Sequence, residues 1–277
     1  MLRTALLVSE EIKQRYVARE ISKVAHLTGI IIEKRYTPSF RWKNFLKRNH
    51  YHPVKIFKEI FLKALLSFYQ REYPQIIKKY FTQGGEPIPW PEGVEVLEVS
   101  HINSPLVVDS LKKWKPDIIV VFGTSIVKKP IMEIPPKGII NVHTGLSPYY
   151  RGGQSAFWCL YNEEPEYIGV TVHFLDEGID SGDIIFTARP SLSPEDNLAI
   201  IECKLALLAT ELLKEALKKI EEGSVRRIKQ WMKGKLYLNK MFTLDKRILV
   251  EKKLRRGLLK RLLPRIKEKE VKIFPPF

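Results

Sequence analysis

The strongest constraint on the fold comes from residues 117–122, where five apolar residues follow one aspartate without interruption. An unbroken apolar run of this length is typical of a strand that is buried on both faces of a parallel sheet. Residues 3–8, 30–32 and 138–142 have similar strand patterns, and helical patterns separate most of them. This alternation predicts an α/β protein with a Rossmann-like, mostly parallel sheet, right-handed crossovers and helices on both faces.

Further elements are expected around these strands. Gly223 follows a long helical pattern and is expected to end that helix. We predict strands at residues 94–99, 169–174 and 183–187, and helices at residues 10–26, 105–115, 155–162 and 194–222.

Two regions depart from the alternating pattern. Residues 37–81 are basic and aromatic, and the spacing of their aromatic residues predicts an insertion of two or more helices. The composition changes again after residue 223. We therefore predict a main domain over residues 1–223 and a basic C-terminal extension over residues 224–277.

The net charge of +16 at pH 7 is unevenly distributed. Residues 224–277 hold 18 Lys and Arg against 4 Asp and Glu, and residues 34–80 hold 12 against 2. The remaining residues hold 17 basic and 25 acidic side chains. Basic segments of this kind contact phosphates in some proteins and are solvated helix faces in others, so both interpretations stay open.

The extension carries an apolar stripe among its basic residues. Val250, Leu254, Leu258 and Leu262 recur every four residues, which places them on one face of a helix. Such a stripe is expected to pack on its own domain or on a second subunit. Binding of RNA or of a membrane is the alternative.

Few features point to metal chemistry or to export. Cys159 and Cys203 are too few for a four-thiolate zinc site or a disulfide framework, and both lie in apolar helical surroundings. No metal site is expected. The apolar run at the N-terminus is too short for a signal peptide, and later apolar runs are too short to span a bilayer. The sequence predicts a soluble, cytoplasmic protein without a membrane partner and leaves homo-oligomer formation open.

The residues with the clearest chemistry follow the strand expected at 138–142. Asn141 and His143 are two positions apart, so a strand would project both side chains to one face. An amide N–H and a protonated imidazole both donate hydrogen bonds, and such donors stabilise developing negative charge where water is excluded. A nearby acidic residue would tune the imidazole and help to move protons.

A larger motif set surrounds this pair. Gly145, Leu146, Pro148, Arg151 and Gly152 follow it, and residues 169–173 (Gly-Val-Thr-Val-His) and 180–182 (Asp-Ser-Gly) come later. With these residues the stretch resembles the formyltransferase family, most firmly over residues 117–188. That family transfers a formyl group from 10-formyltetrahydrofolate to an amine, and it includes glycinamide ribonucleotide, methionyl-tRNA and nucleotide-sugar formyltransferases.

The resemblance implies roles for individual residues. Asn141, His143 and Asp180 match the catalytic Asn, His and Asp of the family. Asn141 would hold the formyl oxygen, His143 would stabilise the tetrahedral intermediate and help to move protons, and Asp180 would orient water or the imidazole. A turn-capping role is the structural alternative for Asp180. Thr171 and His173 are expected to support these residues from behind, and His173 can equally be an ordinary core histidine.

The resemblance also implies where the two substrates bind. The pterin of the family lies between the loop after the central strand and the loop that carries the Asp. The cofactor-binding residues implied here are Gly123, Thr124, Ser125, Ile126, Asp176, Gly178 and Ile179. The acceptor-binding residues implied are Ser147, Tyr150, Arg151 and Gly152.

The identity of the acceptor is less constrained. The first strand leads into Ser9, Glu10 and Glu11 without a glycine-rich phosphate loop, which disfavours the glycinamide ribonucleotide enzymes. Residues 145–148 read Gly-Leu-Ser-Pro where the family more often has Ser-Leu-Leu-Pro. A small amine, such as an amino sugar carried on a nucleotide, is the first hypothesis.

Two alternatives stand beside it. The chain could be a methionyl-tRNA formyltransferase that uses its basic segments to follow phosphates, although the tRNA enzymes append a β-rich domain where residues from 246 onward are helical in pattern. It could also be a non-catalytic folate- or RNA-binding module on the same fold. The joint presence of Asn141, His143 and Asp180 speaks against such a module, because binding alone does not need all three.

Overall fold

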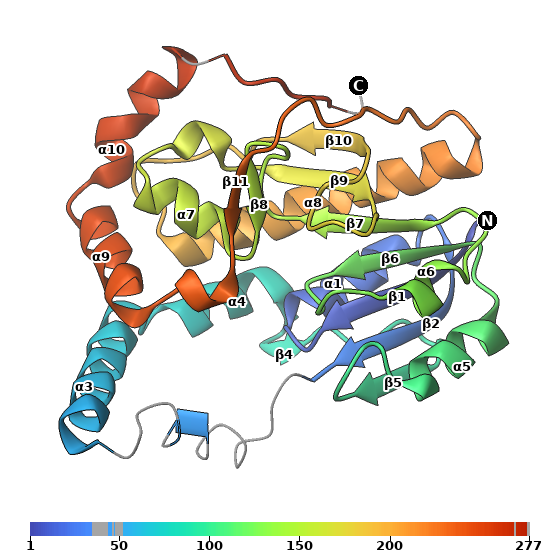
Figure 1. Ribbon diagram of the computed structural model, residues 1–277, viewed down its shortest axis with the longest axis horizontal. Coiled ribbons are helices and arrows are strands. Elements are labelled where there is room, and N and C mark those ends of the chain that lie inside the picture. The colour runs from blue at the N-terminus through green and yellow to red at the C-terminus, as the bar shows by residue number, and fades with distance from the viewer. Residues whose placement is uncertain (35–43, 46, 48–51, 269, 276–277) are drawn as a thin grey trace.

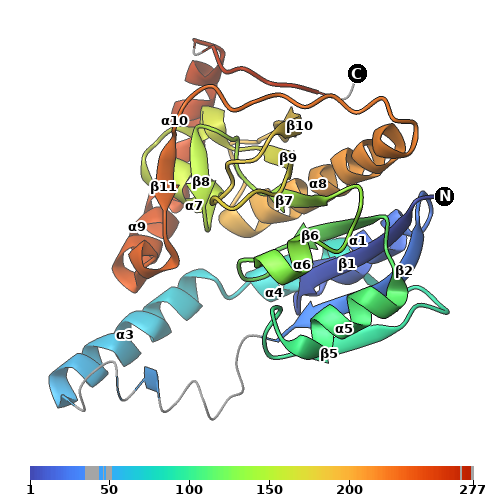
Figure 2. The ribbon, with the colours of Figure 1, turned by 45° about the vertical axis from the view of Figure 1, so that its right-hand side comes forward.

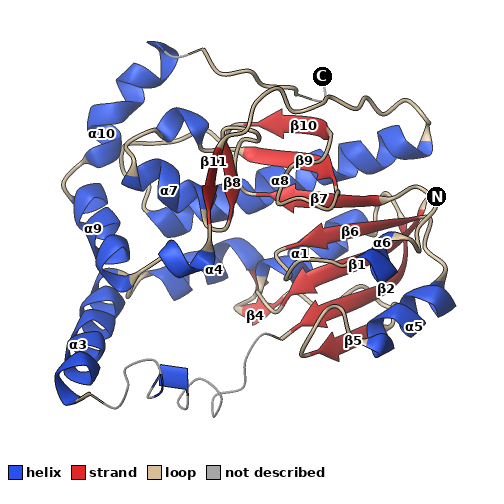
Figure 3. Ribbon diagram, viewed as in Figure 1, coloured by secondary structure: helices blue, strands red, loops and turns tan. Residues whose placement is uncertain are grey.

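The structure is a computed structural model that describes residues 1–34, 44–45, 47, 52–268 and 270–275. Within these residues, seven strands form the central sheet in the order β10-β9-β7-β6-β1-β2-β5 (Figures 1 and 3). Its five strands from β7 to β5 run parallel. At one edge β9 is added antiparallel to β7, and β10 is added antiparallel to β9. The strands are β1 (Arg3–Ser9), β2 (His26–Glu33), β5 (Val96–Val99), β6 (Ile118–Phe122), β7 (Ile139–His143), β9 (Val170–Phe174) and β10 (Ile184–Ala188).

Helices cover both faces of this sheet. Helices α1 (Lys13–Ile21) and α8 (Leu198–Glu221) pack on one face, and α5 (Pro105–Trp114) and α6 (Lys129–Met132) pack on the other (Figures 1 and 2). Strand β1 shows why the sheet needs both layers, because its side chains alternate between the two cores. The predicted fold class is therefore confirmed.

Local interactions set where some elements begin and end. The side chain of Asn197 accepts a hydrogen bond from the Ile200 N–H, so α8 begins at Leu198 rather than at the predicted residue 194. Helix α1 is likewise shorter than the predicted helix over residues 10–26. No helix of the described residues is both long enough and apolar enough to cross a bilayer.

The predicted insertion contains two helices among the residues that the structure describes. They are α3 (Pro53–Tyr69) and α4 (Tyr73–Phe81), followed by the short hairpin of β3 (Thr82–Gln83) and β4 (Glu86–Pro87). Phe81 at the end of α4 is buried with Cys203 and Ala206 of α8. Most of the first part of the predicted insertion, residues 37–51, lies outside the described residues.

The C-terminal extension packs against the main body. It forms β11 (Lys235–Tyr237), η2 (Asn239–Met241), α9 (Leu244–Arg255), α10 (Leu258–Leu262) and η3 (Leu263–Glu268). The apolar stripe of the extension is largely buried in the main core, at Val250, Leu258, Leu259 and Leu262. The packing of these side chains agrees with the expectation that the stripe covers its own chain. The domain boundary near residue 223 stays a prediction.

Two parts of the extension pair with the edges of strands. Strand β11 runs parallel to β8 (Tyr150–Gly152), a strand that the sequence did not predict. Near the C-terminus, the Thr187 N–H donates to the Phe274 carbonyl at 2.8 Å, and the Phe274 N–H donates to the Thr187 hydroxyl at 2.7 Å. The extension therefore covers part of the exposed edge of β10.

Candidate active site

A cleft of about 850 Å³ opens at the carboxyl ends of the parallel strands. This is the position where open α/β sheets bind ligands, because the loops that follow the strands converge there. Residues of the loops after β6 and β9 line opposite parts of the cleft, and Asn141 and His143 at the end of β7 lie between them.

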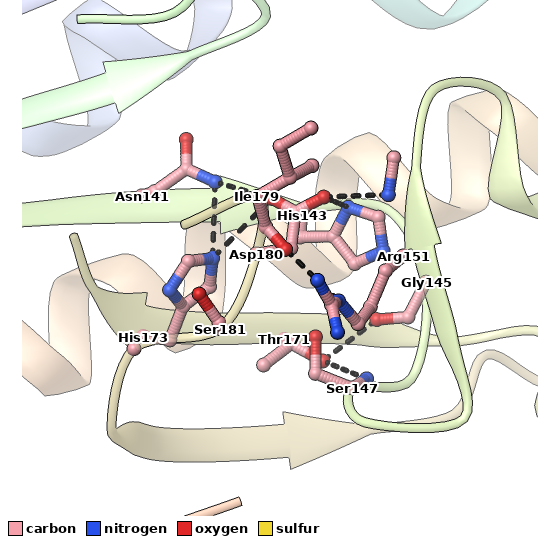
Figure 4. Close-up of polar contacts among 12 residues, drawn as sticks. Asn141, His143, Gly145, Ser147, Arg151, Thr171, His173, Ile179, Asp180 and Ser181 are labelled. Atoms are coloured by element: carbon pink, nitrogen blue, oxygen red, sulfur yellow. Dashed lines mark hydrogen bonds and ion pairs between the residues drawn. The ribbon is translucent and has the colours of Figure 1, made fainter. Parts of the chain in front are cut away.

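The register of β7 against β9 brings four side chains together. Asn141 pairs with His173, and His143 pairs with Thr171. Residues that face each other across an antiparallel pair have neighbouring side chains on the same face of the sheet. The Asn141 amide nitrogen accordingly lies 3.1 Å from Nε2 of His173, and the two are joined by a hydrogen bond (Figure 4).

Asp180 completes this cluster from the loop between β9 and β10. Its Oδ2 lies 3.3 Å from Nδ1 of His143, and its Oδ1 accepts a hydrogen bond of 3.3 Å from the Asn141 amide nitrogen. The Gly152 N–H also donates to Oδ2 at 2.8 Å. Asp180 has a φ of +48°, a left-handed conformation that Asp adopts more readily than most residues.

Both ring nitrogens of His143 face oxygen atoms. Nδ1 faces the Asp180 carboxylate, and Nε2 lies 3.0 Å from the Tyr150 carbonyl and 3.2 Å from the Ser155 hydroxyl. Burial lowers the pKa of His143, while the carboxylate and the carbonyl act in the opposite direction. Because a carbonyl can only accept, the Nε2 proton points to Tyr150, and a second proton has a place between Nδ1 and Asp180. The pair can thus take up and release a proton.

The pKa of Asp180 is held below its ordinary value of 3.8. Burial by itself would raise the pKa, but His143 and the Gly152 N–H stabilise the carboxylate more strongly. The site therefore holds a charged carboxylate next to an imidazole in a buried setting, an arrangement suited to general acid–base chemistry.

Close packing leaves no room for a side chain at residue 145. A Cβ atom at Gly145 would lie 2.5 Å from Nε2 of His143 and 2.6 Å from Cβ of Ser155. A glycine is required here because the backbone passes directly against the imidazole. Thr171 fixes the same loop, since its hydroxyl donates to the Gly145 carbonyl at 2.6 Å and accepts from the Ser147 N–H at 2.9 Å (Figure 4).

The amide of Asn141 has a definite orientation. Its nitrogen donates to Asp180 and His173, while the amide oxygen lies on the opposite side (Figure 4). His173 can accept this bond because its Nδ1 lies 2.7 Å from the Phe174 carbonyl and carries the ring proton. His173 thus orients Asn141.

The residues predicted for the cofactor all lie along the cleft. Two loops carry them, and a buried carboxylate that the sequence did not single out holds one of these loops in place. Glu33, at the end of β2, accepts hydrogen bonds from the Ser125 N–H at 2.6 Å, from the Ser125 hydroxyl and from the Ile102 N–H at 2.9 Å. The cleft-lining residues of this set are Gly123, Thr124, Ser125, Ile126, Asp176, Gly178 and Ile179.

Only one of the four residues predicted to bind the acceptor lines the cleft. Gly152 lines the cleft, but Ser147, Tyr150 and Arg151 are buried and do not line it. Arg151 lies behind the wall, where its Nε donates to the Ile179 carbonyl at 2.9 Å. The Tyr150 ring stacks on the ring of Tyr237 at a centroid distance of 5.7 Å. These three side chains support the cleft from behind.

The extension supplies cleft residues that the sequence did not predict. Tyr237, Leu238 and Asn239 lie along the cleft because β11 pairs with β8. A Cβ atom at Gly152, which has a φ of +87°, would lie 2.1 Å from the Tyr237 carbonyl oxygen, so this pairing depends on a glycine. Residues 236–242 have a short strand pattern, but nothing in that pattern shows where the strand would pair.

A charged group on α1 and α8 lines another part of the cleft. Lys13 lies 2.5 Å from Glu11, and Glu202 of α8 lies nearby. Burial raises the pKa of Glu202, and Lys13 opposes that change. Neither residue belonged to a recognisable motif, so only the packing of α1 against α8 reveals them.

The fold and the site define an α/β protein with a ligand cleft at the strand ends and an Asn-His-Asp cluster at that cleft. Residues 68–217 match the family model described as formyl transferase. The matched segment is more than half of the chain, and the chain belongs to the formyl transferase family.

Curated relatives match part of the chain. A methionyl-tRNA formyltransferase from Acetivibrio thermocellus is 36% identical over 138 residues, which cover 50% of this chain and 44% of that protein. The chain therefore spans less than half the length of this relative.

Solved structures share the fold at low sequence identity. A glycinamide ribonucleotide transformylase from Symbiobacterium toebii superposes with a TM-score of 0.54 at 17% identity, over 82% of this chain and 94% of that one. An N-formyltransferase from Helicobacter canadensis, solved with folinic acid and dTDP-3-aminofucose, gives a TM-score of 0.53 at 13% identity, over 91% of this chain and 79% of that one.

Proposed function

We propose that this chain is an N-formyltransferase that moves a formyl group from 10-formyltetrahydrofolate to an amine. The observation that carries this proposal is the contact of His143 and Asn141 with Asp180 at the cleft. Family membership gives the reaction class. The cluster supplies the donors and the proton-transfer pair that such a reaction needs.

The residues along the cleft fit a folate. The loop after β6 and the loop of Asp180 bound the cleft, and it holds apolar groups, such as the 68% exposed Ile126, together with backbone polar groups. We assign the pterin to the residues of these two loops. When bound, 10-formyltetrahydrofolate supplies an activated formyl group.

The roles of the three side chains follow from their contacts. His143 accepts a proton from the attacking amine or delivers one to the leaving nitrogen, and Asp180 keeps its Nδ1 oriented. Its Nε2 must release the Tyr150 carbonyl when it does so. Asn141 donates to the negative charge that develops on the formyl oxygen. Because both of its N–H bonds are directed at His173 and Asp180, the amide must turn or share one of these bonds when it does so.

A small amine is our first proposal for the acceptor. Helices α9 and α10 occupy the region after α8, and β11 places Tyr237 and Asn239 along the cleft. An acceptor bound beside His143 would thus meet residues of the extension. An amino sugar carried on a nucleotide fits this class of compound.

Methionyl-tRNA is the second candidate acceptor. Methionyl-tRNA formyltransferases are among the curated relatives that match the chain, and the basic surface of α9 and α10 could follow phosphates. A binding module without catalysis is the third possibility. An acceptor assay and a tRNA titration distinguish these two alternatives from transfer to a small amine.

Turnover with a panel of acceptors tests the proposal. The protein is mixed with 10-formyltetrahydrofolate and either nucleotide-linked amino sugars or methionyl-tRNA, and mass spectrometry detects the formylated product. We expect product with an amino sugar, formed about a hundredfold or more slowly by His143→Ala. Formylation of methionyl-tRNA and of no amino sugar would identify methionyl-tRNA as the acceptor. Absence of product and of slow tetrahydrofolate release in every mixture would support the binding module.

Titration with tRNA at low and at moderate salt adds an independent measurement. Each phosphate contact releases counterions, so a tRNA enzyme should bind with a steep salt dependence. Weak binding at moderate salt is expected if the acceptor is a small amine.

A further inference from the structure

Helix α3 exposes an apolar stripe that the proposed reaction does not use. Val54, Phe57, Phe61 and Phe68 have exposed fractions of 68%, 73%, 58% and 54%. Their spacing of three, four and seven residues places them on one face of the helix. In Figures 1 and 2, α3 projects from the body, away from the central sheet. Several large apolar side chains exposed side by side usually mark an interaction site.

A different face of α3 holds the helix in place. Leu66 is buried, and the end of α3 contacts α9, where Arg255 Nη2 donates to the Tyr69 carbonyl at 2.8 Å. Just beyond α3, the Glu251 carboxylate accepts from Gln70 at 2.7 Å and from the Tyr73 hydroxyl at 2.9 Å. Phe68 takes part in this attachment, because the Arg255 guanidinium lies 5.7 Å from the centre of its ring. Val54, Phe57 and Phe61 lie nearer the other end of α3.

Cations border this stripe. The exposed Lys58 is four residues after Val54 and three before Phe61, so it lies at the edge of the stripe, and the exposed Lys55 lies on the same helix. Helices α3, α9 and α10 follow one another along one side of the molecule in both views (Figures 1 and 2). The exposed cations of this region are Lys252 and Arg255 on α9, Arg256 just after it, and Lys260 and Arg261 on α10, of which Arg261 pairs with Glu163.

We propose that α3 docks this side of the protein onto a bilayer surface rich in anionic lipids, with Phe57 and Phe61 inserted between the headgroups. A helix that carries large apolar side chains on one face and Lys beside them lies in the membrane interface, where both kinds of side chain find partners. Anionic headgroups complement the cations of α3, α9 and α10. The contact is peripheral and goes beyond the proposed formyl transfer.

Two other occupants fit the same surface less well. A second copy packed through α3 would bring two sets of cations together, and like charges in close contact weaken association. A nucleic acid would neutralise the cations but would leave most of the apolar stripe exposed to water. The second copy remains a measurable outcome of the test below.

Co-sedimentation of the full-length protein with vesicles tests the proposal. We expect binding to vesicles of phosphatidylcholine mixed with phosphatidylglycerol, weaker binding to pure phosphatidylcholine, and release by salt. The double variant Phe57→Ser/Phe61→Ser should lower the partition coefficient by about tenfold or more, because two large side chains no longer enter the interface. Lys55→Glu/Lys58→Glu should lower binding to the anionic vesicles only.

The matched control is Leu106→Ser on α5, where an equally exposed apolar residue lies outside the stripe. It should bind vesicles like the wild type. Thermal unfolding of each variant should match the wild type, because the substituted side chains are exposed.

Two results would overturn the proposal. One is the absence of binding to anionic vesicles at low salt. The other is a wild-type dimer in lipid-free solution that Phe57→Ser/Phe61→Ser converts to a monomer, which would make the stripe a subunit interface.

Discussion

Nδ1 of His143 lies 3.3 Å from Oδ2 of Asp180, so the last residue of β7 contacts a loop that follows the next strand of the sheet. The same Asp180 oxygen accepts a hydrogen bond from the Gly152 N–H. Three segments of the chain therefore meet at one carboxylate. Substitution of His143 or of Asp180 should therefore change both turnover and stability.

We expect His143→Ala and Asp180→Ala to lower turnover by about a hundredfold or more each, because a general acid–base group or its partner is removed. Single-turnover rates of formyl transfer measure this effect. The control variants are His26→Ala and Asp109→Ala, both exposed residues that do not line the cleft, and both should keep wild-type rates. Near-wild-type turnover in either cluster variant would reject the assigned role.

Asn141→Ala should lower the turnover number by about a hundred- to a thousandfold, the usual cost of losing one donor to a developing oxyanion. Steady-state kinetics with both substrates varied measures this loss. An increase confined to the Michaelis constant would make Asn141 a binding residue instead. His173→Ala provides a comparison, because it removes the acceptor that orients Asn141 and should have a smaller effect.

The depressed pKa of Asp180 predicts how stability depends on pH. The folded state binds this proton less tightly than the unfolded state, whose carboxyl has the ordinary value of 3.8. Asp180 therefore contributes its full stability above about pH 5, and the contribution is lost as the pH falls below this ordinary value. Denaturant unfolding of wild type and Asp180→Asn between about pH 7 and 3 measures it. The stability difference between the two should shrink on acidification, whereas Asp109→Asn should follow the wild type.

Glu33→Gln should weaken the binding of a tetrahydrofolate analogue. The variant keeps one oxygen acceptor but loses the second, so the Ser125 and Ile102 contacts cannot all form. We expect a dissociation constant about tenfold higher, from the loss of about one charged hydrogen bond. Calorimetry measures the constant, and Glu98→Gln on the neighbouring strand β5, with its exposed side chain, should bind like the wild type. An unchanged constant in Glu33→Gln would show that the loop does not contribute to binding.

Hydrogen exchange offers a test of the cleft that needs no substitution. A bound tetrahydrofolate analogue should slow exchange in residues 122–127 and 176–182, because both loops line one cleft at the strand ends. Mass spectrometry of peptic fragments resolves these segments. Protection confined to other segments would mean that the folate binds elsewhere.

The central strands and the proximity of Asn141, His143 and Asp180 could be predicted because their signals are local. The uninterrupted apolar run at β6 indicates a strand buried on both faces, and the Asn-x-His spacing at the end of β7 places two polar side chains on one face. The motif that carries Asp180 supplied the third residue. Each of these patterns can be read from a short stretch of sequence, without knowledge of tertiary contacts.

The supporting contacts could not be predicted, because they depend on tertiary packing. Glu33 has the sequence signature of any charged residue after an apolar strand, and its role appears only when the loops after β5 and β6 lie beside it. Arg151 follows the catalytic motif, yet its side chain turns behind the cleft wall to the Ile179 carbonyl. The spacing of residues in the sequence does not show where the side chain of Glu33 or of Arg151 points.

The attachment of the extension to the catalytic loop has a consequence for biosynthesis. Gln230 Nε2 donates to the carbonyls of Asp180 and Gly182 at 2.8 and 2.9 Å, and β11 adds the residues that line the cleft beside Gly152. A nascent chain that has left the ribosome only as far as the end of α8 thus contains all three residues of the cluster but lacks the segment that holds their loop. We expect the ability to transfer a formyl group to arise only after the extension has emerged and folded back.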